Sequence, residues 1–327
     1  AKGVSFEAML AEPFRRPGFW IFFAIMFLTA STELGPGAWV DVALSQVVGM
    51  PGVLVLVYVS AIMFVMRHFA GPIEHRLSDM GLLCLDLPAE YGCGGGDFRH
   101  EVVMYEELSR RAISGFGQGV HSMCAHYVYN YGTEEQKQRW LPRLAKGELI
   151  GAIAMTEPGA GSDLQGIRTR AVREGDHYRI NGSKIFITNG GSASLLMLVT
   201  RTNPTERKRG LSLIMVETEN LKGYRVGRVL DKMGMPAQDT AELFFEDVLV
   251  PADCLLGPEE GQGLYQLMGD LPYERLVIAL CGVGAMEGAL VETSKYVKER
   301  KAFGQTIGDM QTIRHKLAEV ATLTRVA

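Results

Sequence analysis

The chain has 327 residues, 47% of them hydrophobic, and a net charge of −4 from 33 basic and 37 acidic side chains. These values predict a globular protein of two or three domains and exclude a disordered chain, a collagen-like repeat and a disulfide-rich miniprotein. No basic stripe is available to meet phosphates, which argues against a nucleic-acid partner. The five cysteines are scattered and form no CxxC pair, so neither a metal site nor a disulfide framework is predicted.

The first part of the chain is poor in charged side chains and contains two apolar runs. Val47–Met66 carries no charge and matches a hydrocarbon core of roughly 30 Å at about 1.5 Å per residue. Gly18–Ser31 is shorter and follows Arg15 and Arg16, while Arg67 closes the longer run. Both basic flanks would lie on one side of a membrane, as the positive-inside rule expects. The pattern favours two transmembrane helices over a pair of buried core helices.

From about Ser78 the sequence has the pattern of a soluble protein, and three features predict helices. Residues 99–111 form an amphipathic pattern. Thr133 to Gln136 is a capping box, and the helix it opens is predicted to end near Lys146 and Gly147. Residues 261–327 return to a helical pattern, without a C-cap, which predicts that the chain stops inside its last helix.

Between these helices, residues 150–250 have a β pattern. The dipeptide Asn181-Gly182 predicts a tight hairpin turn between Tyr178–Ile180 and Ser183–Thr188. Four further runs, separated by turn signals at sandwich or barrel spacing, predict strands at 195–202, 211–217, 223–229 and 240–250.

Two motifs carry candidate chemistry. Thr156–Asp163 (TEPGAGSD) is a small-residue loop after the strand-like run Ile150–Met155, and its amides and hydroxyls suit an anion as well as an ordinary turn. Glu274 is the one charged member of a helical stripe of apolar or small residues, namely Leu267, Leu271, Ile278, Cys281 and Ala285. A carboxylate in such a stripe is desolvated, which raises its pKa and suits it to proton abstraction. The alternatives are a buried carboxylate paired with an arginine and a helix whose buried face has a different register.

Several stretches in order along the chain resemble the flavin-dependent acyl-CoA dehydrogenases over residues ~79–327. They include LDLPAEYG, AMTEPGAGSDLQGIRT, INGSKIFITNG, LFFEDVLVP, YVKERKAFG and QTIRHKLAE. The segment from LPYERLVIA onward is most similar to the long-chain and isovaleryl branches. In contrast, FRRPGFW and GMPGVLVLVYVSAIMFVMRHFAGPI look like two neighbouring helices of a major facilitator superfamily transporter. The chain therefore resembles a chimera or a fragmentary reading frame, joined near residues 76–83.

The resemblance implies a fold and four regions. Residues 1–78 would be a membrane hairpin and 79–149 the helical N-terminal part of the dehydrogenase. Residues 150–250 would be its middle β-barrel or sandwich, and 251–327 an incomplete C-terminal helical bundle. The fold class is α+β multidomain, and the protein would be membrane-associated at a bacterial inner membrane, or cytoplasmic if residues 1–78 are artefactual.

The resemblance also implies roles for individual residues. FAD would be held by Met155, Thr156, Gly161, Ser162, Phe186, Ile187 and Thr188, and FAD of a neighbouring subunit by Arg300, Phe303 and Gln311. Arg300 is otherwise one basic residue on a solvated helix face. Ser162 and Arg275 would contact acyl-CoA, and Glu274 would take the α-proton while hydride passes from the β-carbon to FAD, giving trans-2-enoyl-CoA.

The implied partners are an acyl-CoA substrate, an electron-transfer flavoprotein and further copies of the chain in a dimer or tetramer. Three alternatives remain open: an inactive fragment, a transporter remnant with a non-catalytic tail, and an acyl-CoA oxidase that uses oxygen as acceptor.

Overall fold

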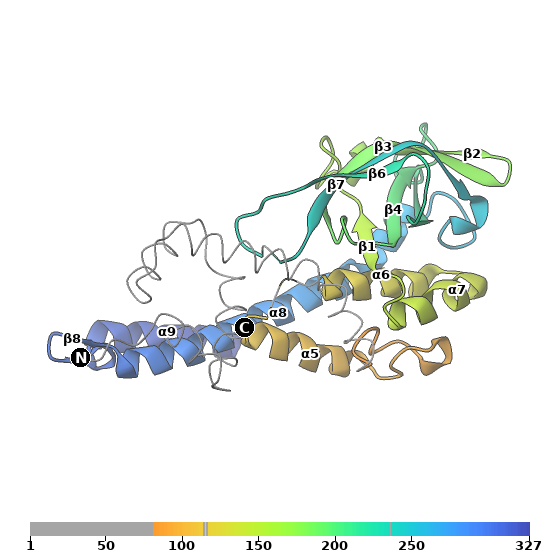
Figure 1. Ribbon diagram of the computed structural model, residues 1–327. Coiled ribbons are helices and arrows are strands. Elements are labelled where there is room, and N and C mark those ends of the chain that lie inside the picture. Colours follow the sequence, from red (N-terminus) through yellow and green to blue (C-terminus); the bar gives the residue numbers. More distant parts are fainter. Residues whose placement is uncertain (1–80, 114, 116, 236) are drawn as a thin grey trace, which may run out of the picture.

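The computed structural model describes residues 81–327, apart from residues 114, 116 and 236, and shows a β domain on a layer of helices (Figure 1). The predicted membrane runs Gly18–Ser31 and Val47–Met66 lie outside the described residues. The helices and 3-10 turns are η1 (Ala89–Tyr91), α5 (Phe98–Arg110), α6 (Gln118–Tyr131), α7 (Glu134–Ala145), η2 (Leu164–Gly166), η3 (Ala252–Cys254), α8 (Gly263–Glu299), η4 (Ile307–Asp309) and α9 (Gln311–Val326).

The strands of the β domain form one seven-stranded sheet in the order β1-β4-β2-β3-β7-β6, with β5 paired to β4. These strands are β1 (Gly151–Ala154), β2 (Arg170–Glu174), β3 (His177–Thr188), β4 (Leu195–Arg201), β5 (Leu211–Glu217), β6 (Tyr224–Val229) and β7 (Thr240–Pro251). Four of them confirm the predicted runs at 195–202, 211–217, 223–229 and 240–250. A small hairpin of β8 (Lys301–Ala302) and β9 (Gln305–Thr306) interrupts the predicted helical region between α8 and α9.

The predicted hairpin at Asn181-Gly182 is wrong, because β3 runs straight through this dipeptide. Its pairing with β7 shifts register between Ile180 and Gly182, so the dipeptide forms a bulge instead of a turn. The Asn181 side chain donates to Asp247 Oδ1 at 3.0 Å and accepts the Asp247 amide at 2.9 Å. The hairpin turn lies earlier, between Glu174 and His177.

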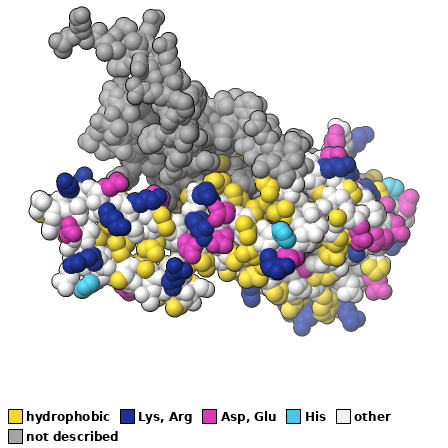
Figure 2. Space-filling view, turned by 90° about the horizontal axis from the view of Figure 1, so that it is seen from below, with side chains coloured by type: hydrophobic (Ala, Val, Ile, Leu, Met, Phe, Trp, Pro, Cys, Tyr) yellow, Lys and Arg dark blue, Asp and Glu magenta, His cyan; other side chains and the backbone are white. Residues whose placement is uncertain are grey.

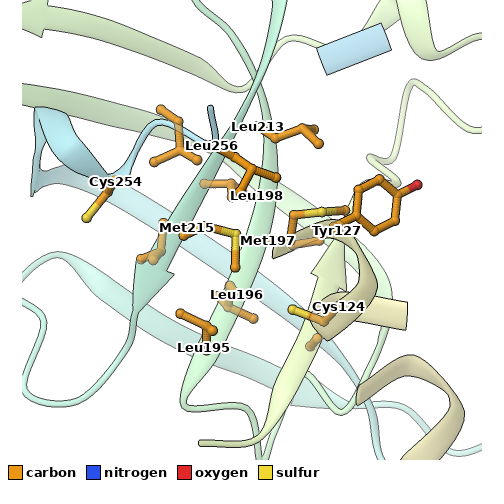
Figure 3. Packing of buried hydrophobic residues seen from close by; sticks show 14 of the residues in the cluster. Cys124, Tyr127, Leu195, Leu196, Met197, Leu198, Leu213, Met215, Cys254 and Leu256 are labelled. Atoms are coloured by element: carbon orange, nitrogen blue, oxygen red, sulfur yellow. The ribbon is translucent and has the colours of Figure 1, made fainter. Parts of the chain in front are cut away.

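The hydrophobic core joins the β domain to α6 and α7. Residues 195–199 of β4 are all fully buried, as expected for a strand covered on both faces. Figure 3 shows Cys124 and Tyr127 of α6 beside this strand, with the hydroxyl of Tyr127 directed away from the apolar cluster. The core therefore fixes the ring of Tyr127 and leaves its hydroxyl free to reach another element.

Polar groups tie α6 and α7 to the first strand. The capping box predicted at Thr133 is present, and Gln136 returns its side chain to the Thr133 amide. Buried His121 links α7 to β1: its Nε2 lies 3.1 Å from the Leu144 carbonyl, and its Nδ1 accepts the Gly151 amide at 3.1 Å. Both bonds suit a neutral imidazole, and burial lowers the pKa of His121 to about 4.

Helix α8 runs along α5 and extends beyond it to α9 (Figure 1). Two glycines allow its close approach: a Cβ on Gly284 would lie 3.0 Å from the Glu106 carbonyl oxygen, and one on Gly288 would lie 2.1 Å from that of Arg110. The Arg110 side chain also donates to Glu287 at 3.2 Å. Figure 2 shows hydrophobic side chains among charged ones on the underside of the molecule.

Within residues 81–327, α8 is also the helix whose length and composition would allow it to cross a membrane. Only 17% of this apolar window is buried, which is less than in a typical core helix, and the covered part of α8 packs against α5.

Candidate functional site

Glu274 of α8 faces α6 and is half-buried. The hydroxyl of Tyr127 donates to its Oε1 at 2.9 Å. Burial raises the pKa of Glu274, the hydrogen bond from Tyr127 lowers it, and the charge of Asp270 raises it further. The raised pKa agrees with the expectation from sequence. This carboxyl is poised to take up a proton, and no described arginine pairs with it.

The packed face of α8 differs from the predicted stripe by one position. Leu271 and Ile278, expected to be covered with Glu274, are exposed in the structure. Leu267 of the stripe is buried as expected, but further along the helix the buried side chains come one residue earlier, at Asp270 and Val277. The contacts of Gly284 and Gly288 with α5 set this orientation, so Glu274 lies at the edge of the packed face among polar neighbours.

The loop Thr156–Asp163 is anchored by a buried ion pair. Lys184 of β3 donates to Glu157 Oε1 and to the Met155 carbonyl, both at 2.9 Å. Glu157 also accepts the amides of Arg168 and Thr169 at 2.7 and 2.9 Å. The anchor fixes the start of the loop against β3, and leaves its glycine-rich tip open.

Phe186 stands at a second irregularity of β3, where the pairing with β7 shifts between Lys184 and Ile187. Its φ is +60°, a left-handed conformation that is strained for a bulky residue, and its side chain is 63% exposed. The adjacent Ile185 amide donates to the Thr156 carbonyl at 2.9 Å, which brings this bulge beside the loop. An exposed aromatic ring next to open loop backbone is suited to stack on a planar group.

The remaining residues predicted for the cofactor differ in exposure. Gly161 and Ser162 are exposed, and a Cβ on Gly161 would meet nothing within 4 Å. Ile187 is 2% exposed, because its side chain lies in the hydrophobic core. Thr188 is half-buried, and Arg275 is exposed on α8 next to Glu274.

Arg300, Phe303 and Gln311 lie at the other end of α8. Arg300 caps the helix, Phe303 is 94% exposed at the tip of the β8–β9 hairpin, and Gln311 begins α9. A rise of about 1.5 Å per residue places Arg300 roughly 39 Å along the helix from Glu274. These three residues and Glu274 therefore do not share one site within a single chain.

Next to Glu274, Tyr273 is held by a buried polar cluster that the sequence analysis did not identify. Its hydroxyl donates to Glu101 Oε2 at 2.6 Å, Ser122 donates to the other oxygen, and its ring stacks on His126 at 4.1 Å. His126 Nε2 lies 3.0 Å from Asp86.

Among the described residues, Asp86, Glu101 and His126 form a group whose ligating atoms lie within 4.8 Å of one another and could hold a metal ion. Both Glu101 oxygens and the His126 nitrogen already have hydrogen-bond partners, so the cluster is satisfied as it stands and anchors α8.

Tyr127, Asp270 and Lys184 were not predicted from the sequence as site residues. The available signal was the spacing of four residues between Tyr127 and Tyr131, which matches the spacing between Asp270 and Glu274. The pairing of these two helices depends on tertiary packing, which a single sequence does not show.

Three family models match consecutive parts of the chain. They are described as acyl-CoA dehydrogenase, N-terminal domain (residues 64–148), middle domain (152–248) and C-terminal domain (261–327). The first match includes residues 64–78, which the sequence analysis assigned to the transporter-like segment.

Individual relatives agree with these models. The mouse (Mus musculus) long-chain specific acyl-CoA dehydrogenase is 51% identical over 76% of this chain and 58% of its own length. The crystal structure of an acyl-CoA dehydrogenase from Geobacillus kaustophilus is 47% identical with a TM-score of 0.75, over 80% of this chain and 68% of that one. A glutaryl-CoA dehydrogenase from Mycobacterium smegmatis in complex with FADH2 is 29% identical with a TM-score of 0.71, over 81% and 72%.

The chain belongs to the acyl-CoA dehydrogenase family, with its helical N-terminal, β middle and helical C-terminal domains. It spans 58–60% of the length of the long-chain relatives it matches from mouse and rat.

Proposed function

We propose that this chain carries out the FAD-dependent dehydrogenation of an acyl-CoA thioester to trans-2-enoyl-CoA, with Glu274 as the base. The observation that carries the proposal is a half-buried carboxyl on α8 that accepts a hydrogen bond from Tyr127 and whose pKa is raised by burial, with no ion pair to an arginine or lysine among the described residues. Such a group accepts a proton readily near neutral pH. The similarity to long-chain specific relatives supports a long-chain acyl substrate.

The residues around the Phe186 bulge fit a flavin. The exposed ring of Phe186 offers a stacking surface, and the loop beside it presents Thr156 and Ser162 with open space over Gly161. We assign Met155, Thr156, Gly161, Ser162, Phe186, Ile187 and Thr188 to this cofactor, with Ile187 contributing backbone only. FAD, when bound there, supplies the acceptor for the hydride that leaves the β-carbon of the thioester.

The protein side of the reaction is a proton transfer. Glu274 takes the α-proton as the carbon–carbon double bond forms, and its oxygen Oε1 is held by Tyr127 during this step. Ser162 and Arg275 are assigned to the acyl-CoA. A dry site strengthens the hydrogen bonds that stabilise the enolate-like transition state.

An electron-transfer flavoprotein is the proposed acceptor of the electrons. An oxidase, which would pass them to oxygen, is the second candidate, and the rate at which the reduced protein reacts with oxygen separates the two. The distance of about 39 Å between Glu274 and Arg300 supports a dimer or tetramer in which Arg300, Phe303 and Gln311 serve a neighbouring subunit.

We also propose that residues 18–66 associate with a membrane, on the basis of the uncharged run Val47–Met66. Expression of residues 1–80 fused to a soluble reporter tests this point. Recovery of the reporter in the membrane fraction after a carbonate wash supports it, and recovery in the soluble fraction contradicts it.

The enzymatic proposal is tested with the full chain purified in detergent and supplied with FAD. Anaerobic addition of a long-chain acyl-CoA is expected to bleach the flavin absorbance. Glu274→Gln should retain flavin but lose the bleaching, whereas Glu292→Gln, on the exposed side of the same helix, should bleach normally. Failure to bind flavin, or bleaching that survives in Glu274→Gln, would refute the proposal.

A further inference from the structure

Two carboxylates of α8 pair with two tyrosines of α6. Tyr127 donates to Glu274 at 2.9 Å, and one turn away Tyr131 donates to Asp270 Oδ1 at 3.2 Å. The two tyrosines are four residues apart in sequence, and so are the two carboxylates. Both hydroxyls therefore lie on one face of α6, and both carboxylates on one face of α8. We call this arrangement the carboxylate–tyrosine pairs.

We propose that Asp270 is a positioning residue that controls when Glu274 carries its proton, acting through the carboxylate–tyrosine pairs. The inference rests on the proposed function insofar as that function makes Glu274 the base. Asp270 itself needs no contact with substrate or cofactor for this role.

The surroundings of Asp270 do not look like those of a structural carboxylate. Asp270 is 6% exposed, and its Oδ1 accepts from both Asn130, at 2.9 Å, and Tyr131. Its Oδ2 is buried and has no hydrogen-bond partner among the described residues. A buried carboxylate oxygen without a hydrogen-bond partner destabilises the folded protein. A carboxylate kept at such a position calls for a reason other than stability.

Within the described part of the chain, the polar and charged groups around these two carboxylates come from α6, α8 and α5. On α6, Tyr127 donates a hydrogen bond to Glu274, while Tyr131 and Asn130 donate to Asp270. The charge of His126, on the same helix, acts on Asp270. On α8 itself, Arg275 is exposed and forms no ion pair with Glu274. On α5, Glu101 accepts a hydrogen bond from Tyr273, the residue before Glu274 on α8. Among the described residues, Asp270 is therefore the group whose negative charge acts on Glu274.

The electrostatic consequence has a definite sign. Burial raises the pKa of Asp270, and the charge of Asp270 in turn raises the pKa of Glu274. Two acids one turn apart in a shielded site do not ionise independently, so each proton lost by one disfavours ionisation of the other. The tyrosines act in opposite directions on Glu274. Tyr127 favours its charged form directly, while Tyr131 favours the charged form of Asp270 and so disfavours that of Glu274.

Changing one side chain at a time separates the effects of Asp270, Tyr131 and Tyr127 on the pKa of Glu274. The full chain is labelled with ¹³C-carboxyl glutamate, and the Glu274 signal is assigned by its loss in Glu274→Gln. The pH at which Glu274 is half-protonated, its titration midpoint, is then measured by NMR without substrate. Asp270→Asn is expected to lower the midpoint by on the order of one pH unit. Tyr131→Phe should lower it less, and Tyr127→Phe should raise it.

Controls and outcomes keep the inference separate from the proposed function. Glu292→Gln, on the same helix, should leave the midpoint unchanged. Asp270→Glu keeps the negative charge, so its midpoint should lie close to that of the unmodified chain. An unchanged midpoint in Asp270→Asn, or shifts of the same sign in Tyr127→Phe and Tyr131→Phe, would overturn the inference. If Asp270→Asn does not fold, the two tyrosine variants decide alone. Because no substrate is present, the titration gives its answer whether or not acyl-CoA bleaches the flavin.

Discussion

Lys184→Met tests the buried ion pair that anchors the loop at Thr156. The substitution keeps most of the aliphatic volume and removes the cation. Glu157, 6% exposed at its side chain, would then remain buried with only the amides of Arg168 and Thr169 as partners. Removing one member of a buried pair typically reduces stability by about 3–5 kcal/mol. That is a large share of the roughly 5–15 kcal/mol that holds a domain folded.

The ion pair between Lys184 and Glu157 stabilises the fold little more than two neutral side chains of similar size would. Burial lowers the pKa of Lys184 to about 8 despite the attraction of Glu157, so desolvation offsets much of the charge pairing. The double variant Lys184→Met/Glu157→Gln should therefore recover to within about 1–2 kcal/mol of the unmodified chain. The glutamine oxygen can still accept one of the two amides.

Urea unfolding followed by tryptophan fluorescence measures these differences, and FAD retention on gel filtration reports on the loop. The single variant should lose flavin as well as stability, and the double variant should regain both in part. A loss below about 1 kcal/mol in Lys184→Met, or a double variant no more stable than the single one, would refute the reasoning.

Three further predictions concern backbone, packing and pH. Phe186→Asn should raise the free energy of unfolding by about 1 kcal/mol, because asparagine tolerates a left-handed backbone, while flavin retention falls; a loss of stability would contradict it. Gly288→Ala should lower the unfolding free energy by about 1–3 kcal/mol, whereas Gly282→Ala, with nothing within 4 Å, should raise it by up to about 1 kcal/mol; urea titrations compare the two. His121, with its pKa lowered to about 4, binds fewer protons folded than unfolded, so stability should fall by about 3 kcal/mol between pH 6.5 and 4 in unfolding curves. His121→Leu should flatten this dependence.

The sequence predicted best what depends on neighbouring residues. The capping box at Thr133 and Gln136 is a local signal, and it begins α7 as expected. Asn181-Gly182 is an equally local signal, but its reading failed because Asn181 pairs with Asp247, 66 residues later. The same dipeptide serves a tight turn or a bulge, and only the partner strand decides between them.

The sequence supplied candidate residues for the site, whereas their contacts came from the structure. Glu274 and the loop at Thr156 were singled out by their sequence patterns, and the resemblance gave them their roles and added Phe186. Beyond Leu267, the stripe around Glu274 was predicted one position away from the packed face, because Leu271 is apolar and Asp270 is charged, whereas the structure buries Asp270. Helical periodicity alone could not show that polar groups from α6 meet this face.

The proposed assembly predicts a particular result when two inactive variants are mixed. One variant carries Glu274→Gln and the other Arg300→Ala, both at exposed or half-buried positions. If Arg300 serves the site of a neighbouring subunit, a mixed dimer holds one site with both residues intact. If Arg300 serves the site of its own chain, every site in the mixed dimer lacks one of them.

Refolding or co-expressing the two variants in equal amounts makes half of the dimers mixed, so about a quarter of all sites should be intact. The expected acyl-CoA-dependent bleaching is therefore about a quarter of that of the unmodified protein, against none for each variant alone. Bleaching that stays at zero in the mixture would place Arg300 in its own chain's site. That outcome requires α8 to fold back on itself, because about 39 Å of continuous helix separates Arg300 from Glu274.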